Sequence, residues 1–262
     1  MAIKYPLHQL EPLLVASPIQ RSGTTLIQRL LSSAPNTLIY GESCAHDINL
    51  MLGLWIQKQG MFDHRSEWRN KQLEQVLAGD VDDWIPDLIP NTTAYLANFE
   101  CLIADSIEFY ARFARDHGRD RWGVKLPGWN AFQLENIMNL IPATKIIYIV
   151  RDIRDCICSA KNAFMCQDLD AIAEFISIWR TNLTQAKQKL KSCQVFWIAY
   201  DDLITHPEKV ISELEQFSGA SGINLDVLAH RINDYDRRHV PPVPLTAAES
   251  ELIRDLLDRV PI

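Results

Sequence analysis

The chain has 262 residues, of which 47% are hydrophobic and 23% are charged, and its formal net charge is -7. This composition is typical of a globular protein with a substantial core, and the acidic balance argues against a surface that binds nucleic acid, which is typically basic. No signal peptide or membrane-spanning run is evident, so we expect a cytoplasmic protein with no membrane partner. The six cysteines lack paired CxxC spacing, which favours free thiols over disulfides or a zinc site.

The stretch from Leu13 to Glu42 predicts a strand, a polar turn and a helix. An apolar run over 13–16 is followed by the segment Arg21-Ser22-Gly23-Thr24-Thr25 and then by leucines at helical spacing. Free N–H groups and the positive end of the helix dipole attract anions at such a junction. The segment therefore predicts a binding loop for a phosphate or sulfate group, with a simple helix cap as the alternative.

Strands and helices alternate along the rest of the chain. We expect further strands over 37–40, 121–127, 145–150 and 195–199, which places Gly41 and Glu42 at the end of the first of them. The helices expected between and after these strands cover 43–59, 91–117, a segment through 140, a segment that follows the 145–150 strand, 171–191, 207–217 and a segment from 247 onward, and 62–90 is expected to be helix plus loop. The alternation predicts an α/β fold, a P-loop-like three-layer sandwich with a central mostly parallel sheet of about five strands flanked by helices, in a single domain over 1–262.

Two more strand ends carry groups suited to an anionic ligand. Arg151 closes the 145–150 strand, and Ser159 follows two helical turns later, where both side chains can contact one phosphate. Tyr200 opens the segment Tyr200-Asp201-Asp202-Leu203 at the end of the 195–199 strand. Carboxyl ends of parallel strands lie at one edge of a sheet, so these groups predict one ligand site there.

These segments resemble those of the sulfotransferases that use 3'-phosphoadenosine 5'-phosphosulfate (PAPS), closest in style to the branch with protein-tyrosine and bacterial natural-product sulfotransferases. The loop Arg21–Leu26 resembles the family's 5'-phosphosulfate loop, Arg151–Ser159 resembles its 3'-phosphate motif, and Tyr200–Pro207 resembles its Y-E/D-D-L-x-x-x-P segment. The chain departs from the family at Gln20 and Ile153, where prolines are usual. Neither departure removes a phosphate ligand.

The resemblance implies roles for three catalytic residues. Glu42 matches the catalytic glutamate of the protein-tyrosine branch and would be the general base for the acceptor hydroxyl. His46, four residues later, is the alternative base. Lys125 matches the strand-end lysine that contacts the sulfuryl bridge.

The resemblance also implies further donor-binding residues. Tyr200 is a candidate for contact with the adenine, and Arg237 or Arg238 is a candidate to close over the 3'-phosphate. Trp122 and Trp129 flank Lys125 in the sequence and are candidates for the adenine or acceptor site.

The predicted function is sulfuryl transfer from PAPS to a hydroxyl of a small-molecule acceptor, such as a natural product, without a metal ion. Protein-tyrosine and carbohydrate acceptors are alternatives. Another class of alternative is a P-loop nucleotide kinase or NTPase, or a non-catalytic nucleotide-binding protein. The kinase alternative is disfavoured because Thr24 stands where the Walker A lysine would be, and because Arg151 precedes the first acidic residue after its strand.

Overall fold

The computed structural model describes residues 9–190, 192–229 and 243–258. Within these residues, five parallel strands form one sheet in the order β2-β3-β1-β4-β5. The strands are β1 (Leu13–Ser17), β2 (Thr37–Tyr40), β3 (Arg121–Pro127), β4 (Lys145–Val150) and β5 (Val195–Ala199). The predicted α/β fold with a parallel sheet is confirmed, and each predicted strand lies where the apolar pattern placed it.

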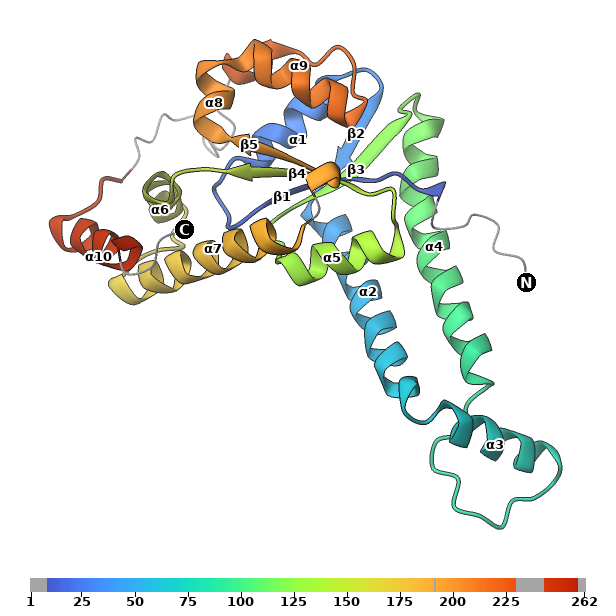
Figure 1. Ribbon diagram of the computed structural model, residues 1–262. Coiled ribbons are helices and arrows are strands. Elements are labelled where there is room, and N and C mark those ends of the chain that lie inside the picture. Colours follow the sequence, from blue (N-terminus) through green and yellow to red (C-terminus); the bar gives the residue numbers. More distant parts are fainter. Residues whose placement is uncertain (1–8, 191, 230–242, 259–262) are drawn as a thin grey trace.

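Helices cover both faces of the sheet (Figure 1). The first face packs against α1 (Thr24–Ser33), α8 (Tyr200–Thr205) and α9 (Pro207–Ser218). The second face packs against α2 (Glu42–Asp63), α4 (Thr92–Asp116), α5 (Ala131–Leu140), α6 (Ile153–Asn162), α7 (Leu169–Lys189) and α10 (Ala247–Asp258). The short helices η2 (Ser192–Gln194) and η3 (Leu225–Ala229) complete the described chain, together with α3 (Ser66–Leu77).

The strand side chains alternate between two apolar cores. Leu13 and Val15 of β1 belong to the core under α1, whereas Leu14 and Ala16 belong to the core under the helices of the opposite face. Successive residues of a strand point to opposite faces, so a central strand covered on both sides is mostly apolar. This requirement explains why β1 is apolar up to Ser17 and why β4 is a run of large apolar and aromatic residues after Lys145.

Side-chain caps explain several helix boundaries. The Asn91 side chain accepts hydrogen bonds from the N–H groups of Thr93 and Ala94, and α4 therefore begins where the sequence predicts. Asn130 and Gln133 form a reciprocal capping box at the start of α5. The helix predicted over 43–59 is longer at both ends in α2, and the exposed Gly53 does not interrupt it.

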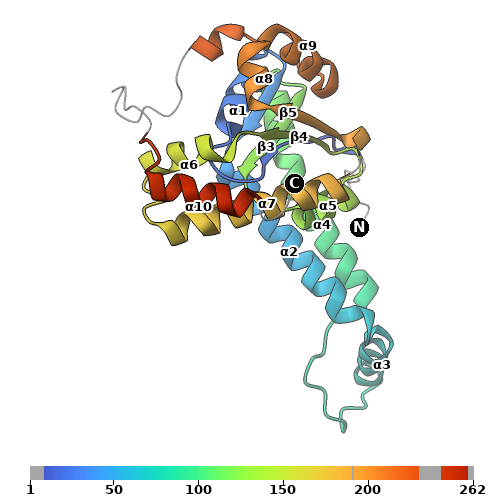
Figure 2. The same cartoon turned by 60° about the vertical axis from the view of Figure 1, so that its left-hand side comes forward.

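The helices α2 and α4 extend together beyond the sheet, and α3 lies at their far end (Figures 1 and 2). The predicted helix plus loop over 62–90 is confirmed, with α3 followed by a loop over 78–91. The side chain of Trp84 in this loop is 81% exposed, and Trp68 of α3 is 41% exposed. Trp84 is therefore not part of a packed core.

The connection after β1 leads toward one edge strand of the sheet, and the connection after β4 leads toward the other. The chain passes from β1 through α1 on the first face to the edge strand β2, and from β4 through α6 and α7 on the second face to the opposite edge strand β5. Open α/β sheets bind ligands at such a topological switch point, outside the carboxyl ends of the strands. The loops after β1 and β4 therefore flank the expected ligand position.

A nearly buried ion pair fixes α10 to α6. Lys161 Nζ lies 2.7 Å and 2.9 Å from the two carboxylate oxygens of Glu249, and each side chain is 11% exposed. Glu249 also accepts a hydrogen bond from the Thr246 N–H at the start of the helix. The hydrogen bond from Lys161 holds the pKa of Glu249 below its usual value.

We predict that Glu249→Gln lowers the free energy of unfolding by about 1–3 kcal/mol at neutral pH, because Lys161 loses its charged partner. The lowered pKa of Glu249 makes this stabilisation complete above the ordinary glutamate pKa, and it is lost as the pH falls through the lower pKa of the folded state. Urea unfolding at a series of pH values will show the gap between wild type and variant narrowing in that acidic window. The exposed Glu251→Gln on the same helix is the control, and an equal loss there would contradict the prediction.

Candidate active site

The turn after β1 presents the free N-terminus of α1. Gly23 is the residue before the helix and has a φ of 107°, and Arg21 is also left-handed with a φ of 69°. No side chain caps α1, and the N–H groups of Thr24 and Thr25 have no acceptor among the described residues. Gly23 is therefore the N-cap residue of α1, and it caps the helix without a side-chain hydrogen bond. Free N–H groups at a helix N-terminus suit an anionic ligand.

The buried side chains of Ser22 and Cys156 support the loop. The Ser22 hydroxyl is fully buried and donates a hydrogen bond to the Ile19 carbonyl at 2.8 Å, so it stabilises the turn. Cys156 of α6 contacts the same hydroxyl at 3.6 Å, and burial raises the pKa of its thiol to about 11. The thiol is therefore protonated at neutral pH and serves in packing. Thr24 is buried and Thr25 is half-buried.

Three of the predicted residues meet beside the loop. Lys125 Nζ lies 2.5 Å from Glu42 Oε1 and 3.4 Å from Thr25 Oγ1. The Lys125 side chain is only 7% exposed, whereas that of Glu42 is 48% exposed. The structure thus joins β3, the start of α2 and the start of α1 through one ammonium group, and it leaves the carboxylate reachable from solvent.

The second predicted motif packs against the first. Arg21 Nε donates a hydrogen bond to Ser159 Oγ at 3.0 Å, and Arg151 Nη1 donates to the Arg21 carbonyl at 3.5 Å. Arg151 also lies 3.6 Å from Asp155 in an ion pair. The Arg151 Nε is buried and has no hydrogen-bond acceptor among the described residues. A guanidinium whose Nε has no acceptor among the described residues suits an anionic ligand such as phosphate.

Tyr200 lies at the same edge of the sheet. Val150 and Ala199 are partners in the β4–β5 register, so Arg151 and Tyr200 directly follow paired residues of adjacent strands. The Arg151 Cζ lies 4.4 Å from the centroid of the Tyr200 ring, in cation–π geometry. The edge of the same ring lies against Gly23 of the first loop.

Other predicted residues lie apart from this cluster. His46 is exposed on α2, one turn beyond Glu42, and makes no hydrogen bond with the described residues. Trp122 and Trp129 are buried in the core of the second face, so the expectation that they line a ligand site is wrong. Arg237 and Arg238 lie outside the described residues.

Sequence analysis did not identify a polar cluster that joins α2 to α4. The Tyr40 hydroxyl donates to the Tyr110 carbonyl at 2.8 Å, and the Tyr110 hydroxyl donates to Asp47 at 3.4 Å. Burial is the largest cause that raises the pKa of Tyr110 to about 12, and nearby Cys44 and Asp47 add to it. These bonds hold the first turns of α2, and with them Glu42, against the edge of the sheet. No sequence motif signals a contact between residues so far apart in the chain.

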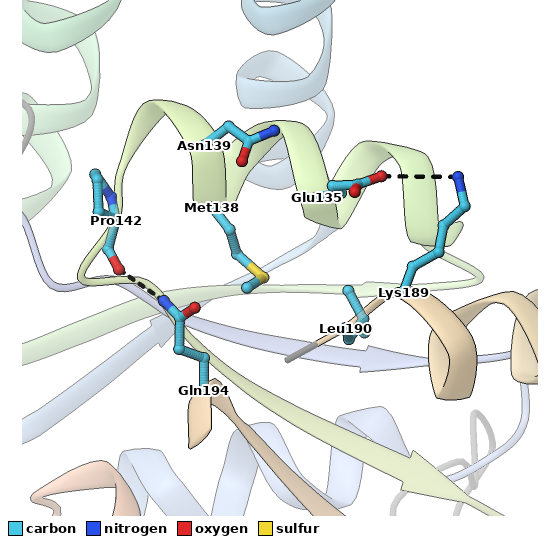
Figure 3. A pocket seen from close by; sticks show the side chains of 7 residues that line it. All are labelled: Glu135, Met138, Asn139, Pro142, Lys189, Leu190 and Gln194. Atoms are coloured by element: carbon cyan, nitrogen blue, oxygen red, sulfur yellow. Dashed lines mark hydrogen bonds and ion pairs between the residues drawn. The ribbon is translucent and has the colours of Figure 1, made fainter. Parts of the chain in front are cut away.

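A hollow of about 110 Å³ lies elsewhere (Figure 3). It is lined by residues that include Met138, Glu135 and Lys189, and Gln194 donates a hydrogen bond to the Pro142 carbonyl at 2.6 Å across it. These residues precede the amino ends of β4 and β5, so the hollow lies at the opposite edge of the sheet from the loops. The hollow therefore does not belong to the candidate site around the loop after β1.

The described residues contain neither a metal-binding cluster nor a membrane-spanning helix. Among them, no group of three or more His, Cys, Asp or Glu side chains has the arrangement of a metal site. Among the same residues, no helix combines the length and the apolar character needed to cross a membrane.

Comparison with known proteins returned a family and a set of similar solved structures. A model of the sulfotransferase family matches residues 14–222. The sulfotransferase domain of the Synechococcus PCC 7002 olefin synthase is similar with a TM-score of 0.50 and 20% identity, over 93% of this chain and 94% of that one. The sulfotransferase domain from the curacin biosynthetic pathway gives 0.51 and 17%, over 83% and 77%. A search of curated proteins found no match. At these identities the structural similarity shows a shared fold.

We predict that Gly23→Ala destabilises the protein by about 1–3 kcal/mol, because alanine is strained at a φ of 107°. The added Cβ would also lie 2.8 Å from Tyr200 Cδ2 and 3.1 Å from Ile149 Cδ1. Gly53→Ala is the matched control: its Cβ meets nothing within 4 Å, and alanine favours a helix interior by roughly 0.5–1 kcal/mol. Chemical unfolding should show a lower free energy of unfolding for Gly23→Ala and a higher one for Gly53→Ala. An unchanged free energy of unfolding for Gly23→Ala would contradict the left-handed backbone at Gly23.

Proposed function

The chain belongs to the sulfotransferase family, and from that premise we propose that it transfers a sulfuryl group from PAPS to a hydroxyl of a small-molecule acceptor. The observation that carries this proposal is the contact of Lys125 with both Thr25 and Glu42. It places a cation and a solvent-accessible carboxylate beside an anion-binding helix N-terminus. Transfer of an anionic group to a hydroxyl requires these elements together.

The donor has anionic groups on both sides of its ribose, and two sites of the chain match them. The free N–H groups of Thr24 and Thr25 and the side chain of Lys125 would hold the 5'-phosphosulfate. Arg151 and Ser159 would hold the 3'-phosphate, for which the unpaired Arg151 Nε supports the assignment.

The proposed reaction is one direct displacement. Glu42 takes the proton of the acceptor hydroxyl, the acceptor oxygen forms a bond to sulfur, and the bond between sulfur and the 5'-phosphate oxygen breaks. Lys125 and the N–H groups at the start of α1 stabilise the negative charge that develops on the departing phosphate oxygen. Glu42 is preferred to His46 as the base because it contacts Lys125, whereas His46 lies a turn away.

The acceptor is proposed to be an organic alcohol or phenol with an apolar body, such as a natural product. Beyond Glu42 and His46, the solvent face of α2 continues with Leu50, which is 73% exposed, and Leu54. Exposed apolar side chains on the helix that begins with the proposed base suit the burial of apolar acceptor surface better than they suit a sugar. A screen of labelled PAPS against phenols, aliphatic alcohols, amines and sugars tests this assignment, and preferential sulfation of sugars would contradict it.

We predict that the protein binds adenosine 3',5'-bisphosphate more tightly than ATP with magnesium, as measured by calorimetry. Arg151→Met should reduce the preference for the bisphosphate over adenosine 5'-monophosphate roughly 10- to 100-fold, because charge-assisted hydrogen bonds to the 3'-phosphate are lost. The control is Arg154→Met, an exposed arginine in the first turn of α6, which should leave both affinities unchanged. Tighter binding of ATP would favour the kinase alternative.

We predict that Glu42→Gln lowers kcat roughly 10²- to 10⁴-fold with the best acceptor from the screen, because the general base is lost. Glutamine keeps an oxygen that can accept from Lys125 Nζ, so the fold should be retained, which thermal unfolding checks. His46→Asn should change kcat by less than about threefold. The reverse pattern, with a large loss only in the His46 variant, would assign the base to His46.

A further inference from the structure

The Tyr200 ring occupies the space between the two phosphate-binding segments. One of its faces carries the Arg151 guanidinium at 4.4 Å, and its edge fills the space where Gly23 lacks a side chain. Its position is set by the sheet register, since Arg151 and Tyr200 follow the paired residues Val150 and Ala199. The ring therefore contacts both Arg151 and the loop that contains Gly23.

We propose that Tyr200 is a positioning residue that holds Arg151 for the 3'-phosphate, which differs from the expected contact with adenine. This inference rests on the proposed function, because it assumes that Arg151 binds the 3'-phosphate of the donor. Arg151 has a flexible side chain, and its only other described partners are Asp155 at 3.6 Å and the Arg21 carbonyl at 3.5 Å. Both distances are long for charge-assisted hydrogen bonds, so the aromatic face is the contact that best fixes the plane of the guanidinium.

The orientation matters because the guanidinium is only partly accessible. The Arg151 side chain is 22% exposed and its Nε is buried without an acceptor among the described residues, so a ligand can reach the guanidinium only through its exposed part. A ring face that the guanidinium carbon packs against keeps that part in place without competing for any of the five donors. The ring supplies no hydrogen bond to Arg151, so its hydroxyl is dispensable for this role.

The experiment compares two ligands that differ only in the 3'-phosphate. Calorimetry is performed with the full chain and with adenosine 3',5'-bisphosphate and adenosine 5'-monophosphate, for wild type, Tyr200→Leu and Tyr200→Phe. Leucine keeps an apolar group against Gly23 and removes the aromatic face, whereas phenylalanine keeps the face and removes the hydroxyl. We expect Tyr200→Leu to weaken bisphosphate binding roughly 2- to 30-fold, the range of a cation–π contact, and to leave monophosphate binding unchanged. Tyr200→Phe should behave as wild type with both ligands.

Equal weakening of both ligands by Tyr200→Leu would overturn the proposal, because that is the result expected from lost contact with adenine. A second test uses Arg151→Met, in which Tyr200→Leu should have no further effect on bisphosphate affinity. If Tyr200→Leu weakens bisphosphate binding as much in the Arg151→Met variant as in wild type, the proposal is also overturned. If Tyr200→Leu does not fold, Tyr200→Met replaces it, since an unbranched side chain fills the same space.

The outcome for wild type separates this inference from the function on which it rests. A wild-type protein without preference for the bisphosphate over the monophosphate would contradict the donor assignment, and Tyr200 would lose its role with it. A wild-type preference that Tyr200→Leu leaves intact would contradict the positioning role alone.

Discussion

The site depends on the parallel arrangement of the sheet. Because all five strands run in one direction, the segments after β1, β2, β3, β4 and β5 emerge at one edge. These segments carry the anion loop, Glu42, the region after Lys125, Arg151 and Tyr200 respectively. An antiparallel strand at any of these positions would place its group at the opposite edge, some 15–20 Å away for strands of this length. The backbone hydrogen bonds of the sheet therefore hold together a site whose residues are up to 180 positions apart in the chain.

The burial of Lys125 imposes a second constraint. A lysine ammonium that is almost excluded from water requires a charged or polar partner, because desolvation of an unpaired charge is costly. Glu42 and Thr25 supply these partners from two other segments. The start of α2 is in turn held by the hydrogen bonds among Tyr40, Tyr110 and Asp47. The position of the proposed base thus follows from a chain of contacts that ends in the α2–α4 packing, and not from the motif around Glu42 alone.

Sequence analysis predicted the sheet well because a strand covered on both faces must be apolar throughout, and such runs are rare and short. It predicted the loop after β1 and the place of Arg151 at a strand end, because a strand pattern followed by a helix pattern can be recognised in the sequence alone. It did not predict that Arg21 bonds Ser159, that Tyr200 stacks on Arg151, or that Tyr110 supports α2, since these contacts depend on register between distant elements. The assignment of Trp122 and Trp129 to a ligand site failed for the same reason: nothing in the sequence distinguishes the buried Trp129 from the exposed Trp84. The roles of Glu42 and Lys125 were expected only through resemblance to a family, and their direct contact was not predicted.

The donor and acceptor sides of the proposed site differ in how they are built. The donor side consists of strand ends inside a sheet that is packed on both faces, so its groups have little freedom to shift. The acceptor side consists of α2 and α4, which extend beyond the sheet and carry exposed apolar side chains along their length. Substitutions on the solvent faces of these helices change what lies beside Glu42 without disturbing the sheet or its register. The fold therefore allows acceptor specificity to change while the groups proposed to bind PAPS remain fixed, and specificity for the acceptor is to be sought on α2 rather than in the loops.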